Sequence, residues 1–172
     1  AGSGFALSLS GAGLHGCADH YAAILNRIGK CDQALAEIGR VLATEPDNPA
    51  YRNLKAAILG RIGEYGPAIE AYEGVLAEYP KHPNAWMSYG HALRSAGRRE
   101  DSIVAYRRAL ALRPGLGEAW WSLANLKTYR FEDAELEQMR SAEADAATSV
   151  TDRYHLCFAL GKALEDRGED AE

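Results

Sequence analysis

Hydrophobic residues recur along the chain at intervals of three and four, with polar residues between them. Trp86, Tyr89 and Leu93 fall on one side of a helix, and Ile103 and Tyr106 do the same in the next segment. Short clusters of glycine, proline and polar residues separate such segments. The pattern predicts an all-α chain without strands. We expect about nine helices, near residues 17–28, 31–44, 49–62, 65–78, 83–96, 99–112, 117–129, 131–146 and 152–167.

The helical segments repeat with a period of thirty-four residues. A glycine follows the first helix of each unit, where it can adopt the left-handed backbone of a tight turn. A proline follows the second helix and prevents its continuation. Small residues such as Ala56 and Ala68 mark the places where two helices cross closely. The chain is therefore expected to consist of helix–turn–helix units. The period is carried by Gly29, Gly63, Gly97, Pro46, Pro80 and Pro114.

One unit, residues 83–116, carries the fullest motif: Trp86, Tyr89, Gly90, Gly97, Tyr106, Ala109 and Pro114. In tandem, these units resemble the tetratricopeptide repeat (TPR) family. The resemblance implies a right-handed superhelical solenoid with a concave inner face. On this basis we expect a flexible Gly/Ser-rich leader at 1–14 and a TPR domain at 15–172. The expected units are 15–48, 49–82, 83–116, a degenerate 117–147 and a truncated 152–172.

The last part of the chain has a more particular resemblance. The segments 118–127, 131–134 and 158–165 are similar to the end of the TPR region in bacterial proteins that carry a sulfotransferase domain after their repeats. This resemblance implies a catalytic domain beyond residue 172. Because no segment of the chain matches that domain's phosphate-binding loop, the chain itself would be a non-catalytic arm. An interaction scaffold and a sulfotransferase arm are the two functions that the sequence leaves open.

Composition excludes several other classes of protein. Hydrophobic residues make up 47% and charged residues 25% of the chain, which is typical of a globular protein. The net charge of −5 argues against nucleic-acid binding. No apolar run is long enough to cross a membrane. The three cysteines, an odd number without a CxxC pair, favour a reducing cytoplasm over a disulfide framework.

Candidate chemical motifs are weak. The GxGxxG string at 11–16 is followed by helical repeats instead of the second strand that a dinucleotide site requires, so we expect no cofactor. His15, Cys17 and His20 lack a fourth ligand, so we expect no metal. No GxSxG motif accompanies the scattered serines and histidines. The sequence therefore predicts no catalytic residues.

The thirty-four-residue register places one set of residues on the first helices of the units, which line the concave groove in similar proteins. Arginine pairs bidentately with carboxylates and phosphates, so three arginines there favour an extended, acidic or phosphorylated peptide. The alternative is that these arginines pair with nearby acidic residues and only increase solubility. The predicted groove residues are Arg27, Asn53, Arg61, Met87, His91, Arg94, Trp121 and Asn125.

The last predicted helix carries more apolar residues than one neighbouring unit can cover. Phe158 and Leu164 belong to this set, and the second helix that would pack on them is missing before residue 172. Repeat arrays require polar ends to stay soluble. We therefore expect self-association through the C-terminal helix.

Overall fold

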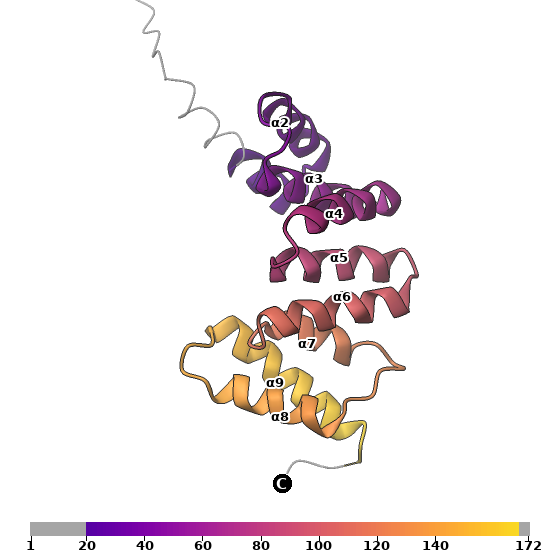
Figure 1. Cartoon of the computed structure of the whole chain (residues 1–172), viewed down its shortest axis with the longest axis vertical. Coiled ribbons are helices and arrows are strands. Elements are labelled where there is room, and N and C mark those ends of the chain that lie inside the picture. The colour runs from indigo at the N-terminus through magenta and orange to yellow at the C-terminus, as the bar shows by residue number, and fades with distance from the viewer. Residues whose placement is uncertain (1–19, 169–172) are drawn as a thin grey trace, which may run out of the picture. The chain divides into compact units, whose positions relative to one another are not determined.

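The computed structural model describes residues 20–168, and this part of the chain forms helices and turns without any strand, as predicted (Figure 1). The chain divides into two compact units, Ala1–Val75 and Leu76–Glu172. Residues 20–27 are helical. The helices that follow are α2 (Cys31–Thr44), α3 (Pro49–Ile62), α4 (Tyr65–Glu78), α5 (Pro83–Ser95), α6 (Arg99–Leu112), α7 (Gly117–Ala124), α8 (Asp133–Ala144) and α9 (Val150–Glu165).

Glycine ends the first helix of a unit in the way that the sequence predicts. Gly29, Gly63, Gly97 and Gly168 have φ values of 83°, 92°, 80° and 70°, which place all four in the left-handed region. Any residue with a Cβ would be strained there. The predicted leader, the GxGxxG string, His15 and Cys17 lie outside the described residues.

The unit Ala1–Val75 has a small core between α2, α3 and the helical residues 20–27. Ala22, Ala34 and Ile38 are fully buried in it. At the crossing of α3 and α4, a Cβ added to Gly60 would lie 3.9 Å from the Cβ of Ala68, which is an ordinary contact. Small residues therefore stand where two helices approach each other, as the sequence indicated.

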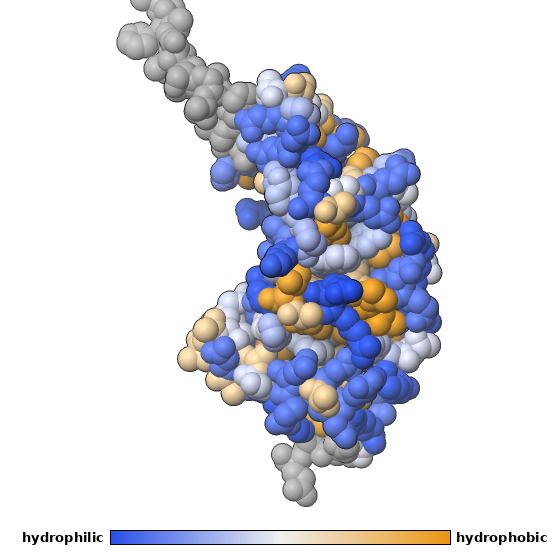
Figure 2. All heavy atoms as spheres, in the orientation of Figure 1, coloured by the Kyte–Doolittle hydropathy of each residue, from blue (hydrophilic) through white to orange (hydrophobic). Residues whose placement is uncertain are grey.

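The unit Leu76–Glu172 has the larger core. Within it α5 packs on α6, α6 on α7, and α9 on both α7 and α8 (Figure 1). Trp120 and Tyr106 are almost completely buried. Trp86 and Trp120, thirty-four residues apart, make the same hydrogen bond: the indole Nε1–H donates over 2.8 Å to the carbonyl of Pro80 in one case and of Pro114 in the other. On the face shown in Figure 2, hydrophilic residues predominate over α8.

The predicted boundaries are wrong around the junction of α7 and α8. A helix at 117–129 was expected, but α7 ends at Ala124 and α8 begins only at Asp133. This connection has no turn glycine, and its apolar residues turn inward instead: Leu126 is buried, and Phe131 packs 6.1 Å from Trp120 between ring centroids. Burial of these two side chains ends the helix early. The helices expected at 131–146 and 152–167 correspond to α8 and α9. Each of their observed bounds differs from the expected one by two residues.

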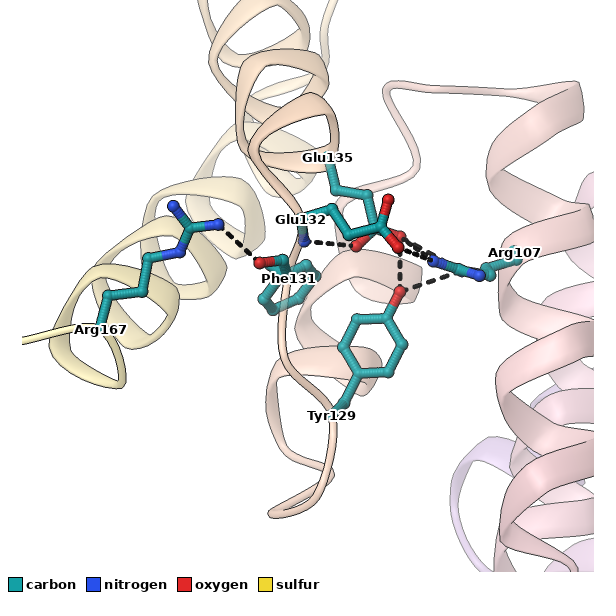
Figure 3. Close-up of polar contacts among 6 residues, drawn as sticks. All are labelled: Arg107, Tyr129, Phe131, Glu132, Glu135 and Arg167. Carbon is teal, nitrogen blue, oxygen red and sulfur yellow. Dashed lines mark hydrogen bonds and ion pairs between the residues drawn. The ribbon is translucent and has the colours of Figure 1, made fainter.

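A polar network fixes this irregular connection (Figure 3). The Tyr129 hydroxyl donates to Glu135 Oε1 over 2.5 Å, and Arg107 Nη2 of α6 donates to the same oxygen over 2.9 Å. Glu135 Oε2 accepts the backbone N–H of Glu132, which caps α8. Burial and the hydrogen bond to Glu135 raise the pKa of Tyr129. The network holds α6, the connection and α8 together.

Candidate functional site

The predicted groove residues divide between the two units. Arg27, Asn53 and Arg61 belong to Ala1–Val75, and the other five belong to Leu76–Glu172. Each group is therefore described by itself.

In the first group, Arg27 ends the helical residues 20–27 and Arg61 lies in the last turn of α3. Both side chains are exposed, and neither forms an ion pair with any residue in 20–168. A cation in the last turn also interacts favourably with the helix dipole. Asn53 is half-buried, and its side-chain oxygen has no hydrogen-bond partner among the described residues. The oxygen itself is buried, so it does not face a ligand.

In the second group, His91 stands at the centre of a polar cluster. Its Nδ1 lies 2.9 Å from the hydroxyl oxygen of the buried Tyr106, and its Nε2 lies 3.4 Å from Glu118 Oε1. The contact with His91, assisted by the charges of His155 and Arg94, lowers the pKa of Glu118. His91 of α5 contacts Glu118 of α7 directly, and the charge of His155 of α9 acts on the same carboxylate. We call the surface that carries these three residues the α5–α7–α9 face.

Arg94 lies in the last turn of α5 and is exposed on this face. It forms no ion pair within the described part of the chain, although its charge acts on both Glu118 and Tyr106. Burial raises the pKa of Tyr106, and the charge of Arg94 partly opposes this effect. The guanidinium of Arg94 therefore remains available to a ligand.

Aromatic side chains lie next to this cluster. The rings of Trp121 and Phe158 are 5.7 Å apart, and those of Phe158 and Tyr154 are 4.6 Å apart. Trp121 was predicted for the groove, whereas Phe158, Tyr154 and Glu118 were not. The turn glycines could have indicated Phe158. It lies ten residues before Gly168, at the position that Met87 occupies ten residues before Gly97.

The two remaining predicted residues differ in position. Met87 is half-buried and packs against the core of its unit, so only part of its side chain reaches the surface. Asn125 follows the last residue of α7, and its Nδ2 donates to the carbonyl of Trp121 over 2.9 Å. Its amide donor is thereby used to cap the helix. The register predicted Asn125 within a helix, but α7 ends at Ala124, so Asn125 caps the helix instead.

Residues 20–168 carry neither a metal cluster nor a membrane span. They contain no group of three or more histidine, cysteine or acidic residues that could hold a metal ion. None of the helices in this range has both the length and the apolar character needed to cross a membrane.

Comparison with known proteins identifies the repeats. The family model described as "Tetratricopeptide repeat" matches residues 25–83 and 54–117, which together cover more than half of the chain. The chain belongs to the tetratricopeptide repeat family. This assignment confirms the family that the thirty-four-residue period indicated. No curated protein matches the sequence.

Solved structures of similar fold include several of MamA. A structure of MamA AMB-1 has 24% identity and a TM-score of 0.57, covering 88% of this TPR chain and 78% of its own. A structure of MamA 41-end from Desulfovibrio magneticus RS-1 has 19% identity and a TM-score of 0.59, covering 91% and 78%. At this identity the likeness shows the fold alone. It confirms the helical-repeat architecture.

Family and fold together favour a protein-interaction scaffold. The matches do not address the sulfotransferase part of the resemblance, which stays a prediction.

The two free cysteines in the described range, Cys31 and Cys157, lie in helices α2 and α9.

Proposed function

We propose that this TPR chain is a non-catalytic, cytoplasmic scaffold that binds an extended acidic segment of a partner protein. In the unit Leu76–Glu172, the segment lies across the α5–α7–α9 face. Arg94 binds its carboxylate, and Trp121 packs against a neighbouring apolar side chain. The observation that carries the proposal is that Arg94 is exposed and unpaired on this face, one helical turn after His91.

Three other arginines of the same unit, unlike Arg94 and Arg108, pair with acidic residues. Arg107 pairs with Glu135 at 2.9 Å, Arg98 with Asp101 at 2.7 Å, and Arg140 with Glu137 at 3.5 Å. For these three arginines the alternative holds, because each of them pairs with a nearby acidic residue. Arg94 does not, because no carboxylate in the described range lies within ion-pair distance of it.

Glu118 limits which acidic segments fit. Its carboxylate lies on the same face and repels a ligand carboxylate placed directly over it. The pKa of Glu118 is lowered, so it stays charged at neutral pH. A favourable ligand therefore places its acidic residue at Arg94 and an uncharged residue at Glu118, next to Trp121.

The residues of the other unit support a second contact of the same kind. Arg27 and Arg61 are exposed and unpaired within residues 20–168. A partner with acidic residues in two places can engage each unit separately. Two weak contacts on one partner strengthen each other through effective concentration.

The test is a titration of a fluorescein-labelled Glu-rich peptide and its Gln analogue, followed by fluorescence anisotropy. The chain is expected to bind the Glu-rich peptide more tightly, and the difference should shrink as salt rises. Replacing Arg94→Ala should weaken this binding about tenfold, since a hydrogen-bonded charge contributes about 1.5 kcal/mol. Arg108→Ala is the matched control, because Arg108 is exposed on α6 and also unpaired among residues 20–168. Equal affinity for the two peptides would contradict the proposal.

A further inference from the structure

His91 lies between a buried tyrosine and a charged carboxylate on the α5–α7–α9 face. Its Nδ1 lies 2.9 Å from the hydroxyl oxygen of Tyr106, which is completely buried. Its Nε2 is also buried and has no hydrogen-bond partner among the described residues, although Glu118 Oε1 lies 3.4 Å away. Buried polar atoms normally form a hydrogen bond. One ring nitrogen of His91 therefore has an incomplete contact.

The protonation state of His91 decides how the ring meets these two neighbours. A neutral imidazole carries one N–H, so it donates at one nitrogen and accepts at the other. An ionised Glu118 can only accept, so the proton of the neutral ring belongs on Nε2 and the Tyr106 hydroxyl donates to Nδ1. The protonated ring donates at both nitrogens. It then forms an ion pair with Glu118 instead of a long contact.

The surroundings of the ring suit both protonation states. The Tyr106 hydroxyl has a second hydrogen-bond partner, the side chain of Ser122. Since hydroxyl groups rotate, Tyr106 can donate to His91 when the ring is neutral and to Ser122 when the ring is protonated. Ser122 is itself buried, so water does not compete for this bond. Only a hydroxyl proton has to turn when His91 becomes charged.

The charge of the face changes with the protonation of His91. The other titratable or charged groups of this cluster are Arg94 from α5, Tyr106 from α6 and His155 from α9. While both histidines are neutral, the charge of Glu118 offsets that of Arg94. A protonated His91 neutralises Glu118 locally and leaves the charge of Arg94 in excess. Glu118 stays ionised, because its pKa is lowered, and Tyr106 stays neutral, because its pKa is raised.

The histidine, and not an acidic ligand, responds to a moderate fall in pH. Histidine is the side chain whose charge ordinarily changes between about pH 5 and 8. A ligand glutamate, with an ordinary pKa of about 4.3, remains ionised over most of that range. A difference in affinity between pH 7.5 and 5.5 therefore reports on the protein.

We propose that His91 sets how many acidic residues this face accepts, because its protonation admits a second ligand carboxylate beside Glu118. This inference rests on the proposed function of the face, in which Arg94 binds the first carboxylate. At neutral pH the charge of Glu118 repels the second one. Once His91 is protonated it pairs with Glu118, and the second carboxylate meets a balanced charge. His91 is a positioning residue, since it acts through Glu118 and does not touch the ligand.

Fluorescence anisotropy with the full chain at pH 7.5 and 5.5, at constant ionic strength, tests the inference. One labelled peptide carries a single Glu among uncharged residues, and a second series carries two Glu residues at spacings of one to four positions. At the best spacing, the two-Glu peptide is expected to bind about fivefold more tightly at pH 5.5, the effect of about one partly exposed charge pair. The one-Glu peptide should change less. In His91→Gln the affinity for the two-Glu peptide should stay at its pH 7.5 value, with an unchanged circular dichroism spectrum.

His82→Asn is the matched control, because His82 is a second histidine at the start of α5. It is exposed and accepts the backbone N–H of Ala85 over 3.2 Å, and asparagine is also a good N-cap residue. This variant should keep the full pH response. Glu118→Gln gives a second readout. It should bind the two-Glu peptide more tightly than the wild type at pH 7.5 and respond less to pH, since a buried imidazolium then lacks its partner.

Four results would overturn the inference. They are an affinity for every two-Glu peptide that is independent of pH, a response that survives His91→Gln, a response that His155→Gln removes instead, and a Glu118→Gln variant that binds no more tightly at pH 7.5. If the one-Glu peptide still binds through Arg94 at pH 7.5, the proposed function stands while this inference fails. Binding that is independent of Arg94 at both pH values would overturn both.

Discussion

Gly117, the first residue of α7, lies directly against the backbone of α9, and replacing it with alanine tests that packing. The new Cβ would collide with the carbonyl oxygen, carbonyl carbon and Cα of Asp152. These are backbone atoms and cannot rotate away, so the two helices must separate. The separation also strains the hydrogen bond of 3.0 Å from the Gly117 N–H to Asp152 Oδ1.

The expected loss follows from these contacts. Overpacking costs about 1–3 kcal/mol, and loss of a hydrogen bond to a carboxylate adds about 1.5 kcal/mol. Alanine returns about 0.5 kcal/mol through its better helix propensity. Gly117→Ala should therefore lower the free energy of unfolding by about 2–4 kcal/mol. In urea this corresponds to a midpoint lower by about 1–2 M.

Tryptophan fluorescence during urea unfolding is a suitable assay because Trp86, Trp120 and Trp121 all lie in the same unit as this contact. The control is Gly39→Ala in α2, where an added Cβ meets no atom within 4 Å. That variant should leave the tryptophan transition in place and slightly stabilise the helical signal. A Gly117→Ala midpoint equal to that of the wild type would refute the packing described for α7 and α9.

Two further variants test the polar contacts. Tyr129→Phe removes the hydroxyl that donates to Glu135 and should reduce the free energy of unfolding by about 1 kcal/mol in urea melts; no change would mean that the network does not stabilise the α7–α8 connection. Glu118→Gln tests whether the charge of this carboxylate makes the stability of the fold depend on pH. Because the folded-state pKa of Glu118 is lowered, its carboxylate stabilises the fold above the ordinary pKa of about 4.3, and this contribution is lost as pH falls through the folded-state value. The wild type should exceed the variant in stability at pH 7, and this difference should shrink as pH falls through the folded-state pKa; a difference independent of pH would contradict this.

Much of the fold could be predicted from the sequence because glycine and proline act locally. The bounds of α2, α3, α4 and α6 agree with the prediction at every residue, and each is flanked by turn residues of the repeat. The α7–α8 connection could not be predicted in this way. Its course depends on Phe131 packing against Trp120 and on Arg107 reaching Glu135 from another helix, and such contacts leave no local pattern.

The candidate site was predicted in part for the same reason. A fixed period can align columns of residues on successive first helices, and the register led to His91, Arg94 and Trp121. It could not indicate that Glu118 would lie 3.4 Å from His91, since that contact depends on how α5 and α7 face each other. Phe158 was missed because the irregular fourth unit shifts the count, and only Gly168 restores it.

A charge exchange on the α5–α7–α9 face tests the central claim most directly. Arg94→Glu would be titrated with the Glu-rich peptide and with a Lys-rich peptide of the same length, beside the wild type and Arg108→Glu. The account predicts that Arg94→Glu loses the Glu-rich peptide and gains affinity for the Lys-rich one, while Arg108→Glu behaves like the wild type. An unchanged preference of Arg94→Glu for the Glu-rich peptide would contradict the assignment of this face as the site for an acidic partner.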